Sequence, residues 1–159
     1  MHNYQKAYSP EQETVEIPVF MPGDLSNYER SDETQALVDE LDTCMANQDY
    51  KNANPLASKL IGIESDNVKF WLALCESTLW HFHPNLALKL LANVRFLFPM
   101  NAQVYLLKAK CYALMGKLDL AFKEMDYALE RDEDIVEQFQ NDPQLYFVLA
   151  MKSRKEQIS

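Results

Sequence analysis

The sequence predicts an all-α protein: an α-α superhelix of three helical hairpins, with a C-terminal capping helix and an extended N-terminal arm. Three observations lead to this prediction. Residues 68–133 repeat with a period of 34, which is typical of stacked helical hairpins. Apolar side chains recur every third or fourth position from about residue 32 onward, as on one side of a helix. The sequence holds only 3 glycines, which argues against a sandwich or barrel with many tight turns.

Composition narrows the classes of partner. The formal net charge of −9 disfavours nucleic acid and anionic membranes, since both select basic surfaces. The sequence has no run of eighteen apolar residues and no apolar core near its start, so we expect a cytoplasmic protein without membrane insertion. Cys44, Cys75 and Cys111 lie in apolar helical patterns without a C-x-x-C pair, which indicates structural thiols.

The arm, residues 1–31, is acidic and differs in pattern from the rest of the chain. Pro10, Pro18 and Pro22 exclude a long helix and favour an extended or disordered segment. One apolar island, residues 17–22, interrupts the polar tail. We expect the island to lie against the repeats of its own chain, or of a dimer mate, as a stand-in ligand. A chance apolar cluster in a disordered tail is the alternative. The side chains that would dock are Val19, Phe20 and Met21.

The first repeat, about residues 34–67, is divergent. Ser31 is the expected cap of its first helix. Ala53 and Ala57 stand one period before Ala87 and Leu91, which places a second helix around them. The pair Asn54-Pro55 can serve as N-cap and first helical residue, so this second helix could start late.

The second and third repeats, about residues 68–101 and 102–135, carry the clearest pattern. Trp71 aligns with Tyr105, Ala87 with Ala121, and Leu91 with Met125. The second repeat reads W-x2-L from Trp71, A-x3-L from Ala87, and then Pro99. The third reads Y-x3-A-x2-Y from Tyr105, then Gly116 at the turn, then A-x3-M from Ala121. These patterns resemble the tetratricopeptide repeat family, whose motif is W-x2-L-G-x2-Y, then A-x3-F, then P. The resemblance implies a protein-binding scaffold without chemistry or cofactors of its own.

Residues 136–159 are predicted to cap the solenoid. A short acidic helical piece precedes Asp142-Pro143, which begins another helix with Asp142 as N-cap. An apolar run, residues 145–151, gives way to cations that suit a helix C-terminus, Lys152, Arg154 and Lys155. A solenoid needs its last apolar face covered, and this helix is the candidate.

No pattern predicts catalysis or a metal. His81 and His83 lie near a turn, but no further ligand has suitable spacing, so we expect His83 to cap the helix at Pro84. No nucleophile elbow, phosphate loop or zinc-protease motif occurs. We therefore expect no enzyme, no catalytic residue, no metal and no cofactor.

The resemblance implies that the first helix of each repeat lines a concave groove. By helical phase, the partner-binding side chains expected there are Val38, Met45, Lys69, Leu72, Glu76, Leu79, Trp80, Leu106 and Lys110, with Asp42, Gln103 and Ala113 on the same faces. Family members that grip acidic chaperone C-termini carry cationic and amide side chains at such places, whereas here stand Asp42, Leu72, Glu76 and Leu106. We expect an apolar groove, although leucines such as Leu72, Leu79 and Leu106 are alternatively interior.

An apolar groove on a small acidic three-repeat protein is similar to the translocator chaperones of bacterial type III secretion. The resemblance implies a chaperone or adaptor that holds an apolar segment of a client protein or peptide. A fixed structural subunit of a larger complex, docked through its N-terminal arm, is the alternative. A homodimer is left open.

Overall fold

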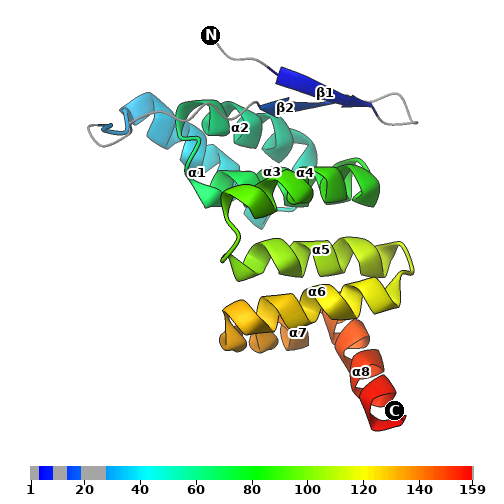
Figure 1. The fold of residues 1–159 in the computed structure, drawn as a ribbon. Helices are drawn as coiled ribbons and strands as arrows, with labels where there is room; N and C mark the ends of the chain where they lie inside the picture. Colours follow the sequence, from blue (N-terminus) through cyan, green and yellow to red (C-terminus); the bar gives the residue numbers. More distant parts are fainter. Residues whose placement is uncertain (1–3, 9–13, 19–27, 159) are drawn as a thin grey trace. The chain divides into compact units, whose positions relative to one another are not determined.

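The computed structural model describes residues 4–8, 14–18 and 28–158 (Figure 1). The chain divides into two compact units, Met1–Leu86 and Ala87–Ser159, called unit 1 and unit 2 below. From residue 32 to residue 158 the secondary structure is helical, with short turns, as the sequence predicts. None of the helices in these described ranges is long and apolar enough to span a bilayer.

The arm adds a feature that the sequence analysis did not predict. Strands β1 (Tyr4–Tyr8) and β2 (Thr14–Pro18) pair antiparallel, with Tyr4 opposite Pro18 and Tyr8 opposite Thr14. Strand β2 lies beside helix α2 (Tyr50–Ile63) in unit 1 (Figure 1). The two described strands of the arm are thus extended and paired with each other. Val19, Phe20 and Met21 lie outside the described residues.

The first helical hairpin of unit 1 consists of α1 (Asp32–Ala46) and α2. Ser31 caps α1 as predicted, because its side chain accepts a hydrogen bond of 3.1 Å from the amide of Thr34. The apolar side of α1 is buried through Val38 and Leu41 and packs on α2. This hairpin corresponds to the divergent first repeat.

The option that α2 starts late, at Pro55, is wrong. Helix α2 begins at Tyr50, with Asp49 as its N-cap, and Pro55 lies inside it. Asn54 does not cap a helix. Its buried amide donates hydrogen bonds of 3.0 Å to the hydroxyls of Ser77 and Thr78 on the next helix. An Asn–hydroxyl contact between two helices therefore replaces the expected cap.

Helix α3 (Val68–His81) packs against α2, and most of its side chains are buried in the core of unit 1. Trp71 is 2% exposed, and its indole nitrogen donates a hydrogen bond of 2.9 Å to the carbonyl of Ser65. This confirms the prediction that Trp71 is buried as the opening aromatic of its repeat. After α3, the ring nitrogen Nδ1 of His83 accepts from the amide of Asn85 at 3.1 Å, so His83 caps α4 (Pro84–Leu97) as expected.

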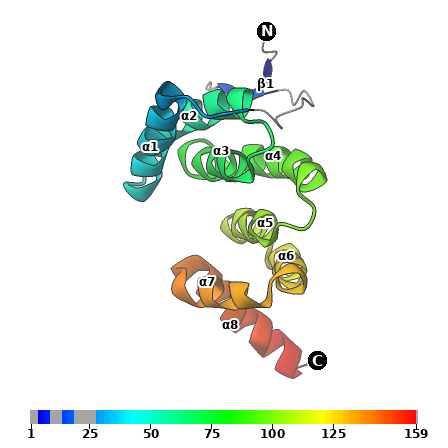
Figure 2. The ribbon, with the colours of Figure 1, turned by 90° about the vertical axis from the view of Figure 1, so that its left-hand side faces the viewer.

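Unit 2 contains most of α4, the hairpin of α5 (Ala102–Leu114) and α6 (Leu118–Arg131), and a C-terminal segment. That segment comprises the short 3-10 helix η1 (Glu133–Ile135), α7 (Val136–Asn141) and α8 (Pro143–Ile158). Helices α5 and α6 lie side by side in both ribbon views (Figure 2). Gly116 makes the turn between them with φ 73°, a left-handed backbone that favours glycine.

The 34-residue period is visible in the burial of small side chains. Ala53, Ala87 and Ala121 occupy equivalent places in the second helix of each repeat, and each is 0% exposed. Four residues later, Ala57, Leu91 and Met125 are also 0% exposed. These values confirm the register of the repeats.

The C-terminal segment caps unit 2 as predicted. Asp142 is the N-cap of α8, because its side chain accepts hydrogen bonds from the amides of Gln144 and Leu145 at 3.0 and 3.3 Å. Leu145 and Val148 are buried where α8 packs against α5 and α6. The cationic end of α8 is tied to α6, where Lys152 pairs with Asp126 at 3.0 Å and Lys155 pairs with Asp119.

Candidate functional site

One face of α3 reaches the surface in unit 1. Apart from the residues at its two ends, the side chains of α3 that are not buried are Lys69, Leu72, Glu76 and Trp80. Their spacing of three, four and four residues places them on a single face of the helix. We call this set the α3 stripe. Every member of it belongs to the groove that the sequence predicts.

The α3 stripe lies next to α1. Lys69 forms a salt bridge of 2.7 Å with Asp42 of α1, and both side chains are about half exposed, at 53% and 50%. Met45, predicted for the same groove, is half-buried near the end of α1. Because Lys69 is neutralised by Asp42, its charge is less available to steer a ligand than the sequence alone indicates.

Three of the predicted groove residues are interior instead. Val38, Leu79 and Leu106 are 4%, 4% and 5% exposed. The alternative that leucines on these faces are interior therefore holds for Leu79 and Leu106. Leu72 remains half-buried, which leaves part of its side chain accessible.

In unit 2, the predicted groove face of α5 contacts the C-terminal segment. Gln103 donates a hydrogen bond of 2.9 Å to Gln138 of α7. Lys110 pairs with Asp142 at 2.6 Å, and the Lys110 side chain is 12% exposed. Burial tends to raise the pKa of Asp142, but hydrogen bonds from Lys110 and from the amides of Leu145 and Gln144 outweigh it and lower that pKa. This ion pair thus fixes the start of α8 against the C-terminal half of α5.

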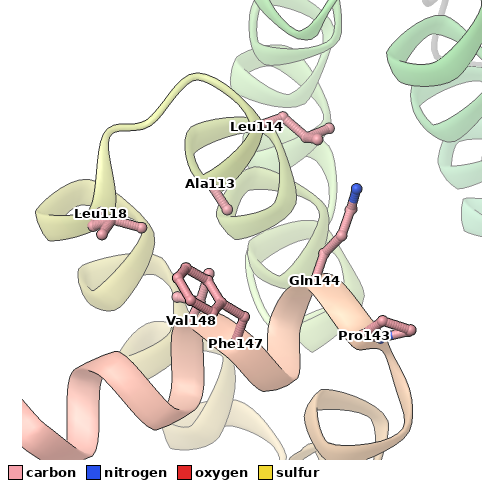
Figure 3. A pocket seen from close by; sticks show the side chains of 7 residues that line it. All are labelled: Ala113, Leu114, Leu118, Pro143, Gln144, Phe147 and Val148. Atoms are coloured by element: carbon pink, nitrogen blue, oxygen red, sulfur yellow. The ribbon is translucent and has the colours of Figure 1, made fainter.

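Beyond the ion pair, α8 leaves an apolar pocket against the end of the α5–α6 hairpin. The pocket encloses about 320 Å³, and its walls come from the end of α5, the start of α6 and the first two turns of α8 (Figure 3). Its lining residues are Ala113, Leu114, Leu118, Pro143, Gln144, Phe147 and Val148. Phe147 and Leu114 are 58% and 40% exposed, so an apolar rim continues to the surface. Of these residues, the sequence analysis placed only Ala113 on a binding face.

The contribution of α8 to this pocket was not predicted. The apolar run from Leu145 to Met151 indicated a capping helix, and only Leu145 and Val148 within it are fully buried. The signal that could have shown the rest is the unbroken apolar sequence Leu145–Leu149, because five consecutive side chains point all around a helix and cannot all face the helices that it packs against. Tyr146 and Phe147 are the side chains that remain exposed.

The described residues show no centre for metal or thiol chemistry. Among the residues that the structure describes, no group of three or more His, Cys, Asp or Glu side chains could hold a metal ion. Cys44, Cys75 and Cys111 are buried, and none of them forms a disulfide within the described residues. Burial raises the pKa of Cys111 to about 12, which suppresses the reactive thiolate. The burial of all three side chains agrees with the expectation of structural thiols.

No protein-family model and no curated protein matches the sequence. Solved structures do match. The type III secretion chaperone SycD of Yersinia enterocolitica, in complex with a peptide of the translocator YopD, is similar with a TM-score of 0.65 and 16% identity, over 80% of this chain and 97% of that chain. The Sgt2 TPR domain from Aspergillus fumigatus has a TM-score of 0.62 and 14% identity, over 80% and 81%. The Arabidopsis OM64 TPR domain has a TM-score of 0.61 and 9% identity, over 77% and 95%.

These similarities agree with the 34-residue period of buried side chains described above. At identities below one fifth they show the fold, which is that of tetratricopeptide repeat domains. This is the fold that Trp71, Tyr105 and the buried small residues of each second helix predict.

Proposed function

We propose that this chain is a non-catalytic protein-binding module: a small cytoplasmic chaperone or adaptor that holds an apolar segment of a client on the first helices of its repeats. The observation that carries the proposal is the α3 stripe. A helix whose other central side chains are buried presents Leu72 and Trp80 to the surface on one face. Apolar side chains at regular spacing on a rigid helix form pockets that receive the side chains of a bound peptide.

The proposal extends to the kind of client. SycD, which has the same fold, was solved in complex with a peptide of a translocator. By analogy of fold, we propose a chaperone of the type III secretion translocator kind. The net charge of −9 supports a protein client over nucleic acid.

The test compares two leucines in the same unit. Leu72→Glu places a carboxylate on the α3 stripe, while Leu56→Glu places one at a half-buried leucine of α2, a second helix. The probe is a fluorescein-labelled ten-residue peptide with leucine at alternate positions, and binding is followed by fluorescence anisotropy. We expect Leu72→Glu to weaken binding about tenfold or more, since an apolar contact becomes a desolvated charge, and Leu56→Glu to change it less than twofold.

Circular dichroism of both variants must show wild-type helicity for the comparison to count. If Leu72→Glu binds the peptide as wild type does, the α3 stripe is not the binding site and the proposal fails. A Leu106→Glu variant is unsuitable, because Leu106 is 5% exposed and a buried charge would damage unit 2.

The second candidate function is a fixed adaptor subunit docked through its arm. The observation that favours it is the position of β2, which lies beside α2 and so sets the arm on the second helix of the first repeat. A complex of constant stoichiometry that survives Leu72→Glu, and that is lost when Ser replaces Val19, Phe20 and Met21, would favour the adaptor.

A further inference from the structure

An aromatic pair stands at the end of the α3 stripe. Trp80 of α3 is 38% exposed and stacks with Tyr50, the first residue of α2, with ring centroids 6.4 Å apart and an interplanar angle of 26°. The two rings come from different helices, so each limits the rotation of the other. Tyr50 is half-buried, which leaves the indole as the more open surface of the pair.

A carboxylate accompanies the aromatic pair. Glu76 precedes Trp80 by one helical turn on the same face of α3. Burial raises the pKa of Tyr50, and the negative charge of Glu76 raises it further, so the carboxylate and the phenol are close enough to interact. Lys69, at the other end of the stripe, forms a salt bridge of 2.7 Å with Asp42.

We propose that Trp80, Tyr50 and Glu76 form a subsite for a basic side chain, a lysine or arginine of the bound segment; this rests on the function proposed above. A cation over an indole face is attracted by the ring quadrupole, and a carboxylate beside it adds a charge-assisted hydrogen bond. An aliphatic side chain in the same place would remove water from the Glu76 carboxylate without donating a hydrogen bond to it. The subsite therefore selects against a purely apolar segment.

The geometry of α3 sets the spacing of the segment. Leu72 and Trp80 are eight residues apart, which corresponds to about 12 Å along a helix. An extended chain covers that distance in about three to four residues. The segment that fits the stripe has an apolar side chain that contacts Leu72. Three or four positions away along the segment, it has a basic side chain that contacts Trp80.

The experiment uses two matched ten-residue peptides and the full-length chain. Both carry leucines and a single variable position four residues from a central leucine, occupied by lysine in one peptide and norleucine in the other. We expect wild type to bind the lysine peptide about fivefold or more tightly than the norleucine peptide. Glu76→Gln and Trp80→Leu should each reduce this preference to less than twofold. Asp66→Asn, an equal change of charge at an exposed site in the turn before α3, should keep the preference.

Each outcome separates the two proposals. If wild type binds both peptides equally, or prefers norleucine, while Leu72→Glu still weakens binding about tenfold or more, the basic subsite is refuted and the apolar binding face stands. A preference for lysine that persists in both Glu76→Gln and Trp80→Leu also refutes the subsite. If neither peptide binds wild type, both proposals fail.

Discussion

Glu64 is the residue on which the base of the arm meets the helices of unit 1. It is the C-cap of α2 and is 6% exposed. Its carboxylate accepts two hydrogen bonds of 2.8 Å from the guanidinium of Arg30, and others of 3.2 Å from Tyr28 and Asn67. A buried carboxylate with so many donors is stabilised in its charged form. Arg30, which falls in the arm that the sequence predicts to be extended or disordered, thus fixes the chain just before α1.

Protonation of Glu64 should loosen unit 1. Hydrogen bonding by Arg30 lowers the pKa of Glu64 from its ordinary value near 4.5. A group with a lower pKa in the folded state stabilises it above the unfolded pKa and loses that contribution as pH falls through the folded value. We therefore expect the melting temperature of wild type to fall more steeply below about pH 4.5 than that of Glu64→Gln.

Fluorescence is the suitable readout, since both tryptophans, Trp71 and Trp80, lie in unit 1. Asp66→Asn is the control, because it removes an exposed carboxylate from the same turn and should leave the pH profile unchanged. Identical acid profiles for wild type and Glu64→Gln would contradict the prediction.

Trp71 should carry a large share of the stability of unit 1. Its side chain is 2% exposed and hydrogen-bonded to Ser65. Truncation of a buried aromatic to alanine costs about 3–5 kcal/mol through the cavity that remains. Trp71→Ala should lower the free energy of unfolding by that amount in urea denaturation followed by far-UV circular dichroism. Trp80→Ala is the matched comparison, because Trp80 is 38% exposed and its truncation should cost far less. Equal losses of unfolding free energy would contradict the prediction that Trp71 is the core aromatic of its repeat.

At the scale of the element, a buried ion pair joins α5 to α6. Lys108 and Glu124 lie 2.9 Å apart, with side chains 11% and 8% exposed. One carboxylate oxygen of Glu124 is buried without a hydrogen-bond partner in the part of the chain that the structure describes. Removal of one member of such a pair leaves a buried charge, whereas removal of both leaves only a change of packing.

A double-mutant cycle measures this difference. Lys108→Met alone should destabilise unit 2 by about 3–5 kcal/mol, because the Glu124 carboxylate loses its counterion. Lys108→Met combined with Glu124→Leu should recover most of the loss, since two apolar side chains then meet between the helices. Hydrogen exchange of the α5 and α6 amides reports on unit 2 directly. Losses that simply add would show that the pair is not coupled.

Two Asx-Pro pairs show which helix boundaries a sequence can predict. Asp142-Pro143 begins α8 as predicted, because Asp142 has extended backbone and caps two amides. Asn54-Pro55 carries the same local signal but lies inside α2, which Asp49 already caps. The side chain of Asn54 is hydrogen-bonded to Ser77 and Thr78 of α3. A partner more than twenty positions away cannot be inferred from a local pattern, so the sequence leaves this boundary open.

In the candidate site, too, the sequence predicts some features and leaves others open. Leu72 and Leu106 stand one period apart and share a helical phase, so periodicity assigns both to the groove. Leu72 is half-buried, whereas Leu106 is 5% exposed. Gln103 and Lys110, which flank Leu106 on the same face, contact α7 and the start of α8. The C-terminal segment has no counterpart in the repeat, and therefore the period predicts the face of a helix but not what covers it.

At the scale of the whole molecule, the question is which part of the chain competes with a client. The described part of the arm contacts α2 in two places. Strand β2 lies beside α2, and Tyr28 and Arg30 donate hydrogen bonds to Glu64 at the C-cap of α2. The α3 stripe belongs to the adjacent helix of the same unit. Val19, Phe20 and Met21 follow β2 in sequence. The prediction that they act as a stand-in ligand can be tested at the α3 stripe.

The test replaces Val19, Phe20 and Met21 by serine in the full chain, which keeps the strands and the Glu64 contacts. Burial of a phenylalanine is worth roughly 2–3 kcal/mol, and ordering several residues costs about as much, so the docked state should be marginal. An occupant with an equilibrium constant of about 1–10 weakens client binding by about two- to tenfold. The triple variant should therefore bind the leucine peptide that much more tightly than wild type. Unchanged affinity would mean that the island does not occupy the α3 stripe, and weaker binding would make the island part of the client interface.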